Sequence, residues 1–238
     1  MKLVELFRQL SYGELSNLSI SDSGSGHIKE EKWPQLVQYT NDGLMALFKR
    51  FTLRQKDLII EQVAHITNYH LKLKFAESFG SDACWPYIKD LPNEKFQDDV
   101  IRILTVHDIF GNRVPLNDDG NPNSMFTPQP DVLQIPRPVS GRPLSIVYQA
   151  SHPKLDDRLG GPVNVLDQEM DLPHYLENTL KQYVASKVFS HLNGQENILK
   201  SQEYMAAYEA DCLGIEQSDL VNQTFQTTHS KLEQRGFV

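Results

Sequence analysis

The chain has 238 residues, 39% of them hydrophobic, and a formal net charge of −8. This length and composition suffice for one large domain, or for one domain that carries an insertion. The acidic balance argues against a protein that grips nucleic-acid phosphates, because such proteins need a basic surface. No apolar run approaches the roughly 20 residues that cross a bilayer, so we expect no association with a membrane.

The first fifty residues predict two helices separated by a loop. Residues 2–10 are amphipathic and predict a short helix, whereas residues 16–27 are rich in Ser, Asn and Gly and predict a loop. A longer helix is predicted from about Glu30, and Gly43 should cost it about 1 kcal/mol relative to Ala unless close packing requires a glycine. The apolar residues expected on its buried face are Leu36, Tyr39, Leu44, Leu47, Phe48 and Phe51.

The middle of the chain has a β-prone texture. Residues 53–73 are rich in Ile, Val, Thr and Tyr and can be read as strands, with helix as the open alternative. Between Asp99 and Asp157 lie most of the prolines, together with short β-prone bursts separated by turn clusters such as NDDGNPN and VSGRP. This pattern predicts a small antiparallel β region with hairpin loops. The expected strands are VIRILTV, RVPL, DVLQI and LSIVYQA.

Residues 171–212 have the most regular pattern and predict a helical hairpin. Asp171 is the expected N-cap, Pro173 suits the first turn, and Gly194 should end the first helix. The short connection that follows makes the second helix an antiparallel partner. The apolar stripe of the first helix is Leu176, Leu180, Val184, Val188 and Leu192, and that of the second is Ile198, Met205, Tyr208, Cys212 and Ile215.

These elements predict an α+β protein, in which an antiparallel α-helical bundle carries an inserted small antiparallel β region and an extended C-terminal tail. We place an N-terminal helical part with possible strands at residues 1–98 and the β insertion at 99–157. The helical hairpin that completes the bundle then occupies 158–222, and the tail 223–238. After about Val221 polar residues dominate, so the tail cannot form a core of its own.

The motifs of common enzymes and metal sites are missing from the sequence. It contains no GxxxxGK[ST], GxSxG or HExxH pattern, and Ser151 beside His152 cannot form a nucleophile pair through adjacency alone. Cys84 and Cys212 lie far apart without a CxxC pair, so buried thiols are expected rather than a zinc site. We therefore expect no catalytic, cofactor-binding or metal-ligating residues, and a protein that is not an enzyme.

The order of elements resembles a known family. The run KWPQLVQYTNDGLMALFKRFTLRQKDLII is followed by DDVIRILTVHDIFG, by RPLSIVYQASHPKLDD and by LPHYLENTLKQYVASKVFSHL, with a final EYMAAYEADC helix. In this order the chain resembles, over about residues 1–220, the head-to-tail adaptor (connector) proteins of short-tailed phages, of the tail tubular protein A type. The Pro-rich loop FTPQPDVLQIPRP has no counterpart that we can place in that family.

The resemblance implies a structural virion protein, made in the host cytoplasm, at the head–tail junction. It implies a homo-oligomeric ring, a dodecamer in that family, that joins the portal protein to a tail tube or nozzle protein. Genomic DNA would pass through the ring without specific binding during ejection. The portal-interface residues that we expect in the tail are Phe225, Leu232, Phe237 and Val238.

Two other functions stay open at this point. A non-viral scaffold or interaction protein would explain the same helical hairpin, and it would remain monomeric in the presence of a portal protein. A hydrolase would need a concave site with a perturbed carboxylate or histidine.

Overall fold

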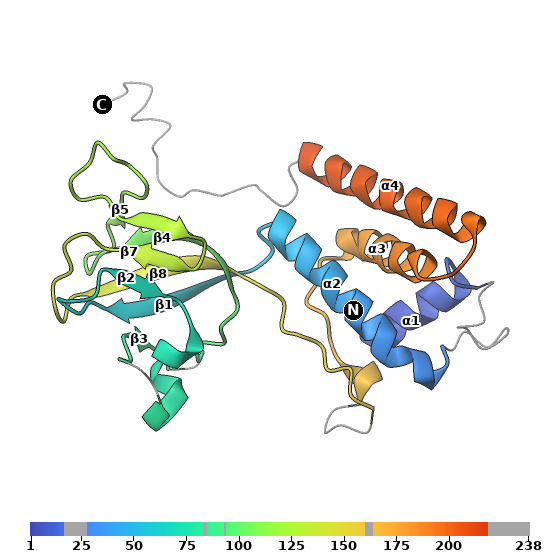
Figure 1. Ribbon diagram of the computed structural model, residues 1–238, viewed down its shortest axis with the longest axis horizontal. Coiled ribbons are helices and arrows are strands. Elements are labelled where there is room, and N and C mark those ends of the chain that lie inside the picture. The colour runs from blue at the N-terminus through green and yellow to red at the C-terminus, as the bar shows by residue number, and fades with distance from the viewer. Residues whose placement is uncertain (17–27, 83–84, 93, 160–163, 219–238) are drawn as a thin grey trace.

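The computed structural model describes residues 1–16, 28–82, 85–92, 94–159 and 164–218. The described chain forms two lobes that lie side by side, one helical and one built mainly of strands (Figure 1). Each lobe has its own hydrophobic core. The combination of α-helices and antiparallel sheets confirms the predicted α+β class.

The α-helices described all belong to the helical lobe, and one core runs between them. The predicted apolar face of the second helix is correct, since all six residues are buried. The third and fourth helices run antiparallel, because Asn178 contacts Asp211 while Ser186 contacts Ser201. The helices are α1 (Leu3–Tyr12), α2 (Trp33–Arg50), α3 (Glu177–Ser190) and α4 (Gln195–Gln217).

The start of α3 differs from the prediction. A 3₁₀ turn, His174–Leu176, precedes the helix, so Asp171 lies outside it and the proposed N-cap is wrong. Pro173 stands directly before the 3₁₀ turn, where its fixed φ suits the entry to a helix. Gly194 has φ +117° and lies immediately before α4, so a glycine does separate the two helices. The remaining 3₁₀ helices are Glu30–Lys32, Leu73–Phe75, Glu77–Asp82 and Val165–Asp167.

The β lobe contains two antiparallel sheets over a common core. The five-stranded sheet has the order β3-β1-β8-β4-β5, and the three-stranded sheet has the order β2-β7-β6. The strands of the first sheet are β1 (Gln55–Glu61), β3 (Ile88–Lys89), β4 (Val100–His107), β5 (Arg113–Val114) and β8 (Pro143–Ala150). Those of the second are β2 (Asn68–His70), β6 (Phe126–Gln129) and β7 (Val132–Gln134).

The β region starts earlier in the chain than predicted. The boundary at residue 99 is wrong, because β1 pairs along its whole length with β8 and therefore lies inside the same sheet. The strand interpretation of residues 53–73 is correct at β1 and β2. The four predicted bursts correspond to β4, β5, β7 and β8, whereas β6 lies in the Pro-rich segment that we could not place.

Two chain segments connect the lobes, one from α2 into β1 and one leaving β8 (Figure 1). The second segment runs back along the helical lobe and is fastened to it. Asn41 of α2 both donates to and accepts from the main chain of Leu155, and the main-chain N–H of Leu3 donates to Gln168. The β lobe is therefore an insertion between α2 and α3 whose two ends are tied to one helical frame.

Candidate assembly surfaces

The tail residues expected at a portal interface, Phe225, Leu232, Phe237 and Val238, lie outside the described residues. The described part ends at Ser218, one residue beyond α4. The candidate contact surfaces that the structure describes therefore lie on the two lobes themselves.

The outer side of α4 carries apolar side chains that contact no core. Seven-, four- and three-residue spacings place four exposed residues on one side of the helix, although Gln202 and Glu203 interrupt them. At its two ends, Leu199 is 54% exposed and Leu213 is 50% exposed. We call this set the outer stripe: Leu199, Ala206, Ala210 and Leu213.

The opposite side of α4 is firmly packed. Tyr208, Cys212 and Ile215 are buried, as the stripe in the sequence predicted. Ile198, placed in that same stripe, is 51% exposed, so its assignment to the core was wrong. The helix begins only three residues earlier, at Gln195, and its first turn extends past the end of α3.

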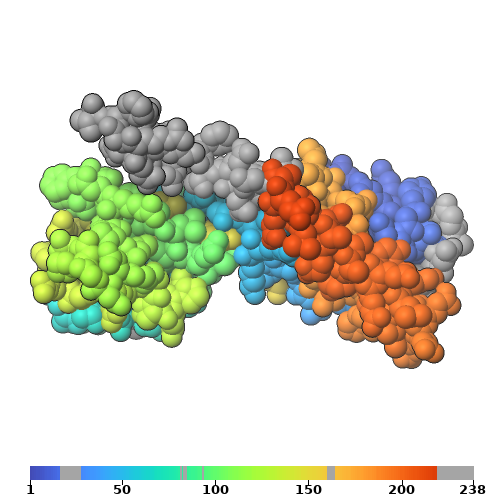
Figure 2. Space-filling view, turned by 90° about the horizontal axis from the view of Figure 1, so that it is seen from above, coloured from blue at the N-terminus to red at the C-terminus, as the bar shows by residue number. Residues whose placement is uncertain are grey.

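Aromatic side-chain contacts hold α4 against α3. Tyr204 stacks on Phe189 of α3, with ring centroids 5.5 Å apart, and Tyr208 meets Tyr183 edge-on at 5.3 Å. Aromatic pairs of this kind add about 0.5–1.5 kcal/mol to the area they bury. The outer stripe therefore sits on a helix whose inner side is fixed, and this helix, orange to red in Figure 2, lies at the surface of the helical lobe.

Arg50, the last residue of α2, links this helix to α4. Its guanidinium lies 2.7 Å from Glu216 and 2.6 Å from Glu209. The hydrogen bond to Glu216 is the largest influence that raises the pKa of Arg50, and in return Arg50 lowers the pKa of Glu216. Both carboxylates are substantially exposed, so solvent weakens the two ion pairs. Because Arg50 bonds both Glu209 and Glu216, it nevertheless fixes the position of the C-terminal part of α4.

The packing of α2 against α3 depends on a glycine. A Cβ atom at Gly43 would stand 2.7 Å from Leu180 Cδ1 and 2.9 Å from Tyr183 Cδ1. The two helices thus approach as closely as a residue without a side chain allows. This close contact explains why α2 keeps a glycine despite its cost to helix stability.

The sequence could not separate the outer stripe from the core. The sequence pattern predicts a single apolar stripe on α4, yet apolar residues stand on both sides of this helix, with Tyr208, Cys212 and Ile215 buried and Leu199 and Leu213 exposed. In the sequence, a second contact surface is indicated only by the weak amphipathic pattern of this long helix.

Some other kinds of site can be assessed over the described residues. No group of three His, Cys, Asp or Glu side chains in that part could hold a metal ion. Cys212 is a buried free thiol whose pKa is raised by burial, and Cys84 lies outside the described residues. A search of the helices in the same part found none long and apolar enough to cross a membrane.

No protein-family model matches the chain, and no curated protein matches its sequence significantly.

Proposed function

We propose that the chain is a structural virion protein, a head-to-tail adaptor whose copies form a ring between the portal and the tail of a short-tailed phage and line the DNA channel. The observation that carries this proposal is the outer stripe of α4. It offers apolar surface outside the core of its own chain, on a helix that α2 and α3 hold in place.

The stripe suits contact with a second copy of the same chain. Its central residues, Ala206 and Ala210, are small, so a neighbouring helix could lie close to the α4 main chain. Covering the exposed half of Leu199 or Leu213 would contribute about 1 kcal/mol for each. Many weak contacts repeated around a closed ring add up to a stable assembly, because every copy uses the same surfaces.

The remaining parts of the chain have matching roles in this proposal. The helices act as an antiparallel bundle that forms the wall of the ring, a dodecamer by family resemblance. The β lobe, which lies beside the helices in Figure 1, reaches toward the tail tube or nozzle protein. The C-terminal tail binds the portal protein through Phe225, Leu232, Phe237 and Val238. DNA passes through the channel without specific binding.

Assembly on a portal tests the proposal. The purified chain is mixed with the portal protein encoded near it, and the products are examined by sedimentation and electron microscopy. We expect a mainly monomeric chain alone and rings on the portal. A chain that ignores the portal and stays monomeric would instead favour a scaffold or interaction protein of another kind.

The outer stripe has a matched control on the same helix. Leu213→Glu places a charge in the proposed interface and should reduce ring formation at least tenfold. Ile198→Glu changes a residue of almost equal exposure that lies beside the outer stripe but not in it, and should leave assembly within about twofold. Equal effects of the two substitutions would show that the outer stripe is not the contact.

A further inference from the structure

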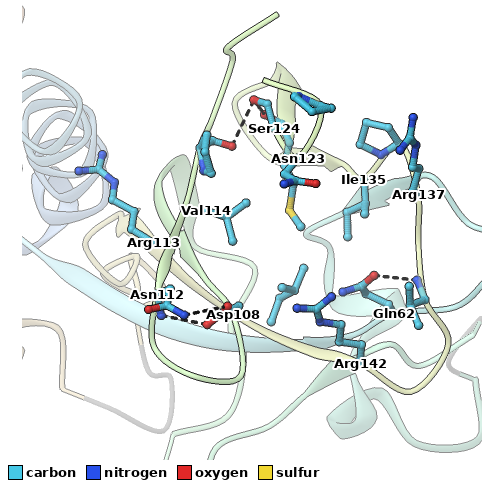
Figure 3. A pocket seen from close by; sticks show the side chains of 16 residues that line it. Gln62, Asp108, Asn112, Arg113, Val114, Asn123, Ser124, Ile135, Arg137 and Arg142 are labelled. Carbon is cyan, nitrogen blue, oxygen red and sulfur yellow. Dashed lines mark hydrogen bonds between the residues drawn. The ribbon is translucent and has the colours of Figure 1, made fainter. Parts of the chain in front are cut away.

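The β lobe contains a hollow that the proposed ring contacts do not use. It has a volume of about 390 Å³ and lies between the β4–β5 hairpin and residues 135–144 (Figure 3). Buried Ile135 and Leu144 contribute to its apolar lining, together with Val114 and Met125. The hollow therefore offers an apolar surface large enough for one or two side chains of a partner.

Gln62 places unused hydrogen-bond donors in this hollow. The residue is only 4% exposed, and its side-chain oxygen accepts from the main-chain N–H of Val139 at 2.9 Å. That bond fixes the orientation of the amide, because a nitrogen in the same place could not accept it. Among the described residues the side-chain nitrogen has no hydrogen-bond partner, and because Gln62 lines the hollow, its NH₂ group is left for a ligand.

Arg142 brings a positive charge to the same place. Its main-chain carbonyl accepts from the N–H of Gln62, and its guanidinium lies beside the Gln62 amide in Figure 3. Within the described part of the chain the guanidinium makes no ion pair or side-chain hydrogen bond. Together Gln62 and Arg142 present hydrogen-bond donors to the hollow, which favours an anionic, acceptor-rich group.

The carboxylate of Asp108, which also lines the hollow, is already used by hydrogen bonds within its own turn. Asp108 accepts from the N–H groups of Phe110 and Asn112 and from the Asn112 side chain. Although desolvation opposes the change, these donors and the charge of Arg142 lower the pKa of Asp108. Asp108 thus stays ionised to hold its turn, and it forms no ion pair with Arg142 among the described residues.

We propose that this hollow binds an acidic side chain from an extended segment of a partner protein, with an apolar residue next to it. The carboxylate would accept hydrogen bonds from Arg142 and Gln62, and the apolar neighbour would contact Ile135 and Leu144. The hollow is lined by three arginines, Arg113, Arg137 and Arg142, and by one carboxylate, Asp108, but the formal charge of −8 disfavours binding along a nucleic-acid phosphate backbone, which needs an extended basic surface. The charge pattern therefore selects a protein ligand, whether or not the chain assembles into a ring.

The rim supplies further contact area for such a partner. Ile109 and Phe110 stand at the tip of the β4–β5 hairpin and are 53% and 76% exposed. Asp108 fixes this turn through its hydrogen bonds, and Gly111 adopts φ +80°, a conformation that glycine reaches without strain. An exposed aromatic side chain beside a pocket with free hydrogen-bond donors can anchor a protein contact, because aromatic residues carry a large share of interface energy.

Titration of the ¹⁵N-labelled full chain with short peptides tests this assignment. The probes are acetyl-Leu-Asp-Leu-amide, the neutral acetyl-Leu-Asn-Leu-amide, inorganic phosphate and a short DNA duplex, and NMR follows the Gln62 side-chain amide and the Arg142 Nε–H. We expect saturable shifts with the acidic peptide and at least tenfold weaker binding of the neutral one. Equal binding of both peptides, no saturation at millimolar concentration, or preferential binding of phosphate or duplex would overturn the proposal.

Substitutions show which side chains of the hollow bind the acidic peptide. Arg142→Gln removes the charge, and Gln62→Glu keeps the acceptor for Val139 while replacing the donors with a negative charge, so each should weaken binding at least tenfold. Arg113→Gln is the matched control, because this guanidinium points away from the hollow in Figure 3; binding should change less than twofold. If Gln62→Glu unfolds the chain, Arg142→Gln still tests the proposal, because Arg142 is exposed and its substitution should not disturb the fold. Unchanged peptide binding by Arg142→Gln would refute the assignment.

Discussion

Gln149 of β8 donates its side-chain amide to the main-chain carbonyl of Phe51, 2.9 Å away, just beyond the end of α2. The same nitrogen also donates to the carbonyl of Phe48, and the side-chain oxygen accepts from Arg102 Nε at 2.6 Å. Gln149 is completely buried. One side chain from the β lobe thus satisfies carbonyls at the C-terminus of α2, which the helix itself leaves unpaired.

We expect Gln149→Leu to destabilise the protein by about 1–3 kcal/mol, because two carbonyls and the Arg102 guanidinium lose a buried partner. Urea denaturation measures the change in the free energy of unfolding. Gln55→Leu, at the exposed position that pairs with Gln149 in β1, is the control and should change stability by less than about 0.5 kcal/mol. Similar small losses in both variants would show that Gln149 does not hold the lobes together.

The two helical glycines should respond oppositely to alanine. Gly214→Ala in α4 should stabilise the protein by about 0.5 kcal/mol, since nothing lies within 4 Å of the added methyl group. Gly43→Ala should instead destabilise it by about 1 kcal/mol, because the clash with Leu180 and Tyr183 exceeds the gain in helix propensity. Thermal unfolding of both variants checks the signs, and a stabilising Gly43→Ala would contradict the close packing of α2 and α3.

His152 should make stability depend on pH. Burial lowers its pKa, although a bond to the carbonyl of Pro153 and the charge of Asp171 oppose the shift. Nε2 accepts from the main-chain N–H of Asp171, so the folded protein favours the neutral ring. Because the unfolded chain binds the proton more readily, stability is retained above the unfolded pKa, near 6.5, and falls as pH drops toward the folded pKa.

The loss from His152 should not exceed about 1.4 kcal/mol per pH unit, the value for one proton. Denaturation at pH 7.5, 6.5 and 5.5 measures it. His152→Gln keeps polar atoms in the ring's place and should flatten this part of the profile. An unchanged slope in that variant would assign the pH dependence to other groups.

The C-terminal tail should be needed for docking on the portal. Truncation after Asn222 removes all four proposed anchors and should abolish ring formation on isolated portal, because buried aromatic residues carry a large share of interface energy. Circular dichroism of the truncated chain checks that the monomer fold survives. Docking at the full-length level would eliminate the proposed role of the tail.

The assembled channel should bind DNA only weakly. The chain carries 31 acidic and 23 basic residues, and an acidic or neutral channel lets a duplex slide without being held. We expect no submicromolar binding of a duplex at near-physiological salt, measured by fluorescence anisotropy. Tight binding that weakens steeply with added salt would instead indicate a phosphate-gripping surface.

The amino-acid sequence by itself determined most of the elements and several of their buried faces. The apolar spacing of α2 and α3 predicted residues such as Leu47 and Leu180 in the core, and alternating β-prone bursts predicted β4 and β8. These patterns are local, since a side chain's face follows from the 3.6-residue or two-residue period of its own element.

Only the tertiary structure decided which elements meet. The pairing of β1 with β8 moved the start of the β lobe to Gln55, and the Gln149 bridge and the free amide of Gln62 arise from residues far apart in the chain. The two sides of α4 also became distinct only when α2 and α3 covered one of them. Such relationships depend on long-range packing and on hydrogen bonds that particular neighbours supply or withhold, which no local period encodes.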